Sequence, residues 1–177
     1  LSCHPLPYLC RKKKSLTLIK SVSGIRGTLG GQPGESLSPI DIVKFASGYA
    51  AWIKENQLGN HIILGRDARI SGDMVSSLVA STLIGSGLHV TDLGLSTTPT
   101  VEMAVILQKA AGGIILTASH NPGNWNALKL LNQKGEFLSK KDGERVLELG
   151  ENPETLQFST VEELGAYNFD EQGLTSV

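Results

Sequence analysis

The sequence predicts an α/β fold, specifically a three-layer α/β/α sandwich with a mixed, mostly parallel sheet. Short apolar runs alternate along the chain with segments that carry apolar residues at helical spacing. The segments between successive runs are long enough to hold crossover helices, which join parallel strands and cover both faces of a sheet. Polar loops also follow several of the predicted strands, and such loops gather at one edge of a parallel sheet.

Five strands are predicted from apolar runs bounded by glycine or polar residues. They lie at residues 16–22, 61–65, 88–94, 112–117 and 127–131. The glycine-rich segment 23–28 after the first strand is expected to be a loop, and so are the charged residues 66–72 after the second strand.

Four helices are predicted between and after these strands. Ser38 and Pro39 supply an N-cap and a first-turn proline for a helix that continues to about residue 56. Glycines at 85 and 87 end the next helix, which begins near Met74. The remaining two helices are expected from Thr98 to about residue 109 and over residues 140–149.

Composition and length fit one folded domain. Of 177 residues, 40% are hydrophobic and 19% are charged, and the formal net charge is −1. This balance is not that of a disordered chain and gives no sign of a nucleic-acid partner. No apolar run approaches the roughly 20 residues that span a bilayer, and the start lacks a secretory core. We expect a cytoplasmic protein with neither nucleic acid nor membrane as a partner.

The first 15 residues are expected to be an unstructured extension, either a mis-start or an added segment. They contain Cys3 and Cys10, two prolines and a run of basic residues. The cysteines lack the paired spacing of structural zinc sites, so we predict no metal site there.

The segment 117–122, Thr-Ala-Ser-His-Asn-Pro, follows the apolar run of the fourth predicted strand. It would place the Ser119 hydroxyl at the carboxyl edge of the sheet, where α/β folds bind ligands. His120 beside it can act as an acid or a base. Serine, asparagine and proline also favour turns for conformational reasons, so a purely structural loop is the alternative interpretation.

Three motifs taken together indicate a function more specifically than the segment 117–122 does alone. SGIRG (23–27), GRDARISG (65–72) and TASHNP (117–122) occur in this order after predicted strands. The trio resembles the first domain of the phosphohexose mutases, the family of phosphoglucomutase, phosphomannomutase and phosphoglucosamine mutase. The resemblance covers residues 16–150. It implies that residues 151–177 form a tail or the start of an interdomain linker, and that the chain is the amino-terminal part of a longer enzyme, inactive by itself.

The resemblance also implies an activity. In this family the serine corresponding to Ser119 is carried as a phosphoserine, and phosphate moves between the 1- and 6-positions of a hexose phosphate through a bisphosphorylated intermediate. The partners implied are a hexose phosphate and the remaining domains. The cofactors implied are hexose 1,6-bisphosphate and Mg²⁺, which is held through the phosphate on Ser119 and by aspartates of a second domain.

The resemblance also implies roles for individual residues. His120 and Lys129 join Ser119 as catalytic residues that assist proton transfer and stabilise charge. The candidates for binding substrate or phosphate are Arg26, Arg66, Arg69 and Asn121. Asn121 and Pro122 are also expected to shape the serine loop, and Asp67 to tie neighbouring loops together.

One residue departs from the family pattern. The family reads Asn-Gly two residues before the lysine, whereas this chain has Ala127 there. Alanine adopts a positive φ less readily than glycine, so we expect an altered turn that affects how Lys129 is presented. The alternative function is a non-catalytic module that binds sugar phosphates or another protein. The sequence does not specify which hexose phosphate is the substrate.

Overall fold

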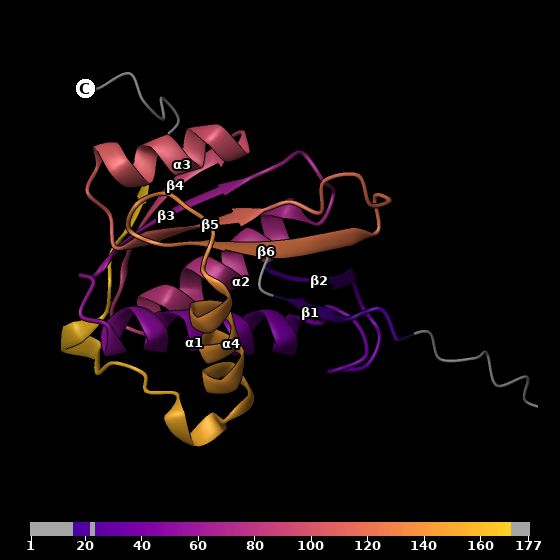
Figure 1. Cartoon of the computed structure of the whole chain (residues 1–177), viewed down its shortest axis with the longest axis horizontal. Helices are drawn as coiled ribbons and strands as arrows, with labels where there is room; N and C mark the ends of the chain where they lie inside the picture. The colour runs from indigo at the N-terminus through magenta and orange to yellow at the C-terminus, as the bar shows by residue number, and fades with distance from the viewer. Residues whose placement is uncertain (1–15, 22–23, 171–177) are drawn as a thin grey trace, which may run out of the picture.

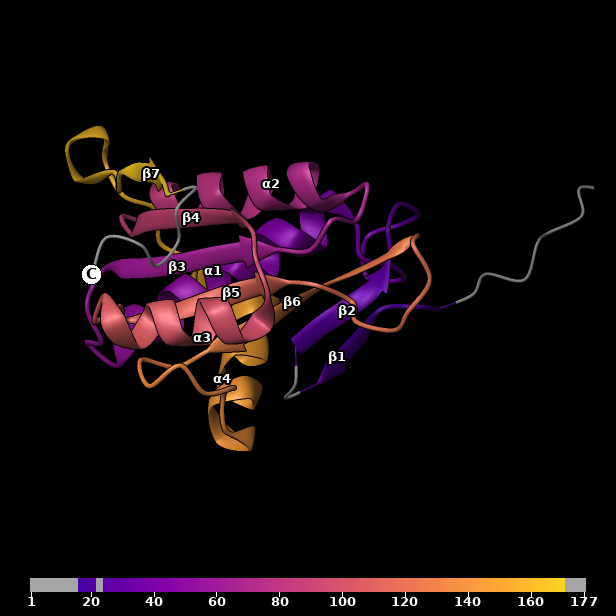
Figure 2. The same cartoon turned by 90° about the horizontal axis from the view of Figure 1, so that it is seen from above.

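The computed structural model describes residues 16–21 and 24–170, which form an α/β/α sandwich (Figures 1 and 2). The predicted extension at residues 1–15 lies outside this part. The strands are β1 (Ile19–Ser21), β2 (Gly24–Thr28), β3 (His61–Arg66), β4 (His89–Leu95), β5 (Gly112–Leu116), β6 (Trp125–Leu131) and β7 (Tyr167–Phe169). The helices are α1 (Pro39–Glu55), α2 (Gly72–Gly85), α3 (Thr98–Leu107) and α4 (Lys140–Glu151), followed by 3-10 turns at Pro153–Thr155 and Val161–Glu163.

The layers are held by two apolar clusters, one on each face of the sheet. The larger cluster packs α1, α2 and α4 against the sheet, with Phe45 and Val79 among its fully buried members. The smaller cluster packs α3 on the other face through Val101 and Val105. Figure 1 shows α3 on one side of the sheet and α1 and α4 on the other. The predicted three-layer α/β fold is confirmed.

The sheet is mixed. Its strand order among the described residues is β1-β2-β6-β5-β3-β4-β7. The pairs joining β5, β3, β4 and β7 are parallel, and the pairs joining β1, β2, β6 and β5 are antiparallel. Strand β6 runs antiparallel to β5 because the Ser119 loop returns the chain directly from β5 into β6 without a crossover helix.

The expected loop at residues 23–28 is wrong for residues 24–28, which form β2. Glycine indicated a turn, but here it permits close approach of the backbone. A Cβ on Gly24 would lie 2.4 Å from the carbonyl oxygen of Leu128, and a Cβ on Gly27 would lie 2.9 Å from the backbone nitrogen of Leu37. Glycine inside a strand commonly marks such an approach. Arg26 is therefore presented by a strand.

The predicted helices are confirmed, with ends within about two residues of the predicted positions. Ser38 caps α1, because its side chain accepts a hydrogen bond from the Asp41 backbone N–H while Asp41 accepts one from Ser38. Pro39 occupies the first turn as predicted. No helix within the described ranges is both long and apolar enough to span a bilayer.

The segment after α4 returns to the sheet. Strand β7 pairs in parallel with β4 at one edge, opposite β1 (Figure 2). The approach is guided by the backbone N–H of Ala166, which donates a hydrogen bond of 2.9 Å to Nδ1 of His89. The residues predicted as a tail thus extend the sheet up to Phe169.

Candidate functional site

The loop that carries Ser119 leaves β5, a strand buried along its whole length. Ser119 itself is exposed and has a φ of 53°, in the left-handed region that residues other than glycine adopt rarely. Its backbone N–H donates to Oγ1 of Thr117 at 3.1 Å. Strained backbone of this kind occurs often at functional sites, where the surrounding structure must maintain it.

Ser119 opens into a cavity of about 460 Å³. Five of the predicted site residues line it together: Arg26, Ser119, His120, Asn121 and Lys129. The remaining lining residues are Gly24, Thr117, Ala118, Ala127 and Phe137. The structure therefore brings together residues that are far apart in the sequence and come from β2, β6 and the loop between β5 and β6.

Strand register places Arg26 and Lys129 on the same side of the sheet. Arg26 of β2 pairs with Ala127 of β6, and Lys129 follows two residues later. Side chains two residues apart in a strand share a face, and paired residues on neighbouring strands do so as well. Two cationic side chains consequently approach the Ser119 loop from the sheet.

The cavity has a cationic lining. Its charged side chains are those of Arg26 and Lys129, and the described residues that line it include no carboxylate. Among the described residues, Arg26 has no ion pair, so its guanidinium is free to bind a ligand. This electrostatic character suits an anionic ligand such as a phosphorylated sugar.

Arg66 lies elsewhere. Its Nη2 is 2.5 Å from Oδ1 of Asp73, and it lines a second cavity of about 570 Å³ beside β4 and β7. That cavity also contains Asp92, so its charge is mixed. The structure does not place Arg66 with the Ser119 cavity, because the side chain at the end of β3 is turned toward the start of α2.

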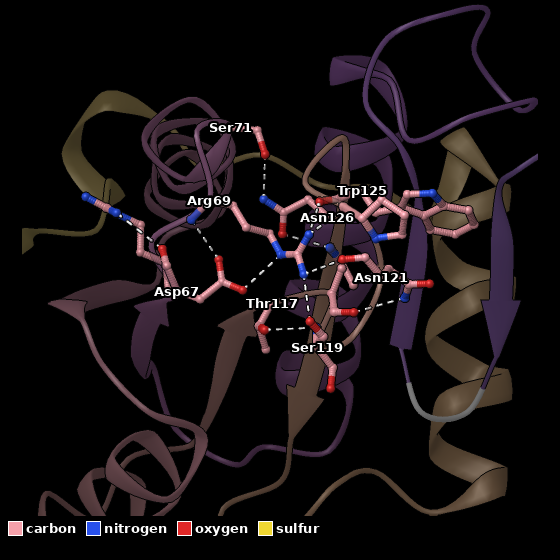
Figure 3. A network of polar contacts seen from close by, with 12 residues as sticks. Asp67, Arg69, Ser71, Thr117, Ser119, Asn121, Trp125 and Asn126 are labelled. Carbon is pink, nitrogen blue, oxygen red and sulfur yellow. Dashed lines mark hydrogen bonds and ion pairs between the residues drawn. The ribbon is translucent and has the colours of Figure 1, made fainter.

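Arg69 reaches the Ser119 loop but points its donors at protein oxygens (Figure 3). Nε donates to Oδ2 of Asp67 at 3.0 Å, and the four terminal N–H groups donate to backbone carbonyls. These carbonyls belong to Ser119 (2.7 Å), Asn121 (2.9 Å), Pro122 (2.7 Å) and Trp125 (3.1 Å). All five N–H groups of the guanidinium are engaged, so in this conformation Arg69 has no donor left for a phosphate.

Asn121 likewise turns inward. Its side-chain amide donates to the carbonyl of Ala118 at 2.9 Å, and its backbone N–H donates to the same oxygen at 3.1 Å. These bonds form a tight turn just after Ser119. The expected loop-shaping role agrees with this geometry.

Asn126 helps to hold the site together, a role that the sequence analysis did not identify. Its side chain is fully buried, and its amide donates to Oγ of Ser71 at 2.9 Å, at the start of α2. A buried asparagine within an apolar strand needs a hydrogen-bond partner for its amide. Its position in such a strand could therefore have indicated this structural role. The bond fixes the start of β6 to the GRDARISG segment.

The altered turn expected at Ala127 does not occur. Ala127 lies within β6 and is buried, and among the described residues positive φ values outside glycine occur at Gln57, Lys109 and Ser119. Alanine is compatible with extended strand backbone, so the substitution leaves Lys129 in regular register opposite Ile115. In this part of the site, the residue other than glycine with a left-handed backbone is Ser119.

The described residues do not form a metal site by themselves. Within residues 16–21 and 24–170, no group of three His, Cys, Asp or Glu side chains could hold an ion. Magnesium prefers several oxygen ligands, and the Ser119 cavity offers no carboxylate from the described part of the chain. A phosphate on Ser119 would supply at most part of the ligand set.

Comparison with known proteins agrees with this geometry. The family described as phosphoglucomutase/phosphomannomutase, alpha/beta/alpha domain I, matches residues 18–157. A phosphoglucomutase/phosphomannomutase of Thermococcus kodakarensis is 35% identical over 125 residues, covering 69% of this chain and 27% of that protein. A phosphoglucosamine mutase of Ligilactobacillus salivarius is 34% identical over 153 residues, covering 85% of this chain and 33% of the relative.

Solved structures show the same fold. A protein of Thermus thermophilus superposes with a TM-score of 0.73 at 27% identity, over 88% of this chain and 33% of that one. A phosphoglucomutase/phosphomannomutase family protein of Burkholderia thailandensis gives 0.70 at 20% identity, over 89% and 33%. This chain spans about a quarter to a third of the relatives it matches. With the family match over most of its length, the chain belongs to the phosphoglucomutase/phosphomannomutase family and contains the α/β/α domain I of that family.

Proposed function

We propose that this domain supplies the phosphate-carrying serine of a phosphohexose mutase, with Ser119 as the carrier. One observation carries the proposal. The exposed Ser119 hydroxyl stands on a strained loop at a cavity whose charged lining residues, Arg26 and Lys129, are cationic. Phosphoryl transfer requires mainly a positioned oxygen and positive charge around the moving group. The names of the relatives compared above, a phosphoglucomutase/phosphomannomutase and a phosphoglucosamine mutase, support this class of substrate.

The chemistry would proceed by exchange at phosphorus. The bond between phosphorus and Oγ of Ser119 breaks, and a bond forms between phosphorus and a free hydroxyl oxygen of the hexose phosphate. The hydroxyl proton is passed on as Oγ regains one, so the products are a hexose bisphosphate and free serine. Transfer of the other phosphate back to Ser119 completes the isomerisation.

Three side chains are proposed to assist. His120 is adjacent to Ser119 in the loop and is assigned to proton transfer. Lys129 is assigned to the charge that develops on the transferring oxygens. Arg26, on β2, is assigned to the phosphate that the substrate keeps, since a guanidinium matches phosphate geometry.

The whole reaction is proposed to need more than these residues. The chain spans only part of its relatives, and the described residues lack a complete Mg²⁺ site. Magnesium and hexose 1,6-bisphosphate therefore remain expectations from the family, with the other metal ligands coming from outside the described residues. We infer that domain I alone does not turn over, and that the domains completing the cleft are its partners.

The test is a mutase assay on the full-length product of the gene, which follows interconversion of hexose 1-phosphates and 6-phosphates. Ser119→Ala should abolish turnover, because no oxygen remains to carry the phosphate. Ser81→Ala is the matched control, since Ser81 is an exposed serine of α2 that lines the other cavity. A Ser119→Ala variant as active as the control would refute the proposal. Glucose, mannose and glucosamine phosphates are compared in the same assay to identify the sugar.

A further inference from the structure

We propose that Arg69 is a positioning residue for Ser119. Arg69 holds the backbone of Ser119 in its left-handed conformation and so keeps the serine hydroxyl directed into the cavity. The inference rests on the proposed function only in taking Ser119 as the reacting group. It gives Arg69 a role different from the phosphate binding that the sequence suggested.

The contact pattern sets Arg69 apart from an ordinary surface arginine. Four of its N–H groups bind backbone carbonyls drawn from residues 119–125, a single short segment. Carbonyl oxygens that converge on one point repel one another unless a cation with several donors lies between them. A guanidinium presents five donors in a fixed plane, whereas an ammonium presents three from a single nitrogen.

Asp67 aims the guanidinium at these carbonyls. Its carboxylate accepts from Nε of Arg69 at 3.0 Å and from the Arg69 backbone N–H at 3.1 Å. The side chain of Arg69 is only 12% exposed, so water competes little for its donors. Asp67 and Arg69 therefore form a rigid unit at the end of β3.

This unit is fixed to the rest of the domain on two sides. The backbone carbonyl of Arg69 accepts from the N–H of Gly72 at 2.8 Å, at the start of α2. Asn126, at the start of β6, donates to Ser71 in the same segment. The Ser119 loop is thus clamped between β3, α2 and β6 (Figure 3).

The consequence for Ser119 follows from its backbone. The Ser119 carbonyl is turned to Arg69 at 2.7 Å, and its N–H is turned to Thr117 at 3.1 Å. With both peptide groups held, φ stays at 53° and the side chain lies on the side away from the guanidinium (Figure 3). Left-handed backbone is strained at a residue other than glycine, so it persists only where contacts of this kind maintain it.

The direct test is NMR spectroscopy of this chain, which needs no catalytic activity. In the unaltered protein, the terminal N–H protons of Arg69 should exchange with water more slowly than those of the exposed Arg26. In Arg69→Ala and Arg69→Lys, the Cα and Hα shifts of Ser119 should move from left-handed toward random-coil values. Guanidinium ion, added to Arg69→Ala well below denaturing concentrations, should restore the Ser119 shifts.

Arg145→Ala is the matched control. Like Arg69, Arg145 is ion-paired, in its case with Glu55 and Glu148, but it lies on α4 away from the Ser119 loop. Its loss should leave the Ser119 shifts unchanged. If the Ser119 shifts are also unchanged in both Arg69 variants, the proposal is wrong. If Arg69→Ala does not fold, the exchange measurement decides, because rapid exchange at Arg69 in the unaltered protein would overturn the clamp.

Mutase activity distinguishes a failure of the role proposed for Arg69 from a failure of the role proposed for Ser119. In the full-length gene product, Arg69→Lys should lower kcat by ~100-fold with little change in KM, as expected when a reacting atom is misplaced by about 1 Å. An equal rise in KM would indicate substrate binding by Arg69 instead. Failure of Ser119→Ala to abolish turnover would refute the mutase proposal, yet the NMR result on the loop would still stand.

Discussion

The ammonium nitrogen of Lys129 lies 5.9 Å from the centre of the Phe137 ring, and both side chains line the Ser119 cavity. An aromatic face attracts a cation without carrying an opposing charge. Phe137 therefore restrains Lys129, whereas a carboxylate partner would neutralise it. The positive charge remains available to a phosphate group in the cavity.

Removal of the Lys129 charge should impair transfer strongly. We expect Lys129→Met to lower the turnover of the full-length gene product by ~100-fold or more, because charge on the transferring oxygens is left unbalanced. Phe137→Leu should cost only a few-fold, in line with the ~0.5–1 kcal/mol of an exposed cation–π contact. Steady-state kinetics of both variants tests this, and equal losses would contradict the distinction between them.

Gly24 should tolerate no side chain. Its φ is 121°, and a Cβ there would lie 2.4 Å from the carbonyl oxygen of Leu128. Gly24→Ala should lower the free energy of unfolding by at least ~1–3 kcal/mol through backbone strain. Urea unfolding measures this. Gly123→Ala on the Ser119 loop is the control, since nothing lies within 4 Å of its Cβ position, and it should change stability by less than ~0.5 kcal/mol.

Gly24 also shows why part of the fold could not be predicted from the sequence. Helices α1 to α4 and the central strands were predicted because their signals are local: apolar spacing, the cap at Ser38 and the proline at 39. Strand β2 was missed because glycine indicates a turn equally well, and Gly24 is needed for contact with β6, a strand far along the chain. Strand β7 was missed because a three-residue edge strand carries almost no pattern.

Stability should depend on pH through His61. Burial, and then the nearby charge of His89, lower the pKa of His61 below its usual value of 6.5. The unfolded chain therefore takes up this proton at a higher pH than the folded chain does. As pH falls from above 6.5 toward the lowered pKa, the free energy of unfolding should decrease.

Urea unfolding at a series of pH values between about 8 and about 5 measures that slope. His61→Gln should flatten it, since the titrating group is gone. A slope that survives in His61→Gln would contradict the assignment.

Tyr49 should stabilise the core through its hydroxyl. The hydroxyl donates to the carbonyl of Leu131 at 2.7 Å, and burial raises the pKa of Tyr49 far above its usual range, so it stays a donor. Tyr49→Phe should cost ~1–3 kcal/mol, because a buried carbonyl loses its partner. Tyr167→Phe, at a half-exposed tyrosine that donates to Asp92, should cost less. Equal losses in thermal unfolding would argue against the burial effect.

For the site, the sequence predicts most of the residues that lie together, but not where each side chain points. Ser119, His120, Lys129 and Arg26 meet in one cavity, as the motif order indicated. A charged side chain gives no sign of its direction in the sequence, and that is why Arg66 and Arg69 were grouped with them. The contacts separate the two: Arg66 turns to Asp73, and Arg69 binds the carbonyls of the loop.

Mass spectrometry of the peptide that contains Ser119 shows whether this serine carries phosphate during the reaction. The full-length gene product is incubated with hexose 1,6-bisphosphate, digested, and compared before and after addition of a hexose monophosphate. When the phosphates of the bisphosphate carry an oxygen isotope label, we expect a labelled phosphate on Ser119. As turnover proceeds, this phosphate should pass to the sugar and be replaced on Ser119 by the unlabelled phosphate of the monophosphate. Turnover by a protein whose Ser119 is never phosphorylated would contradict this role of Ser119.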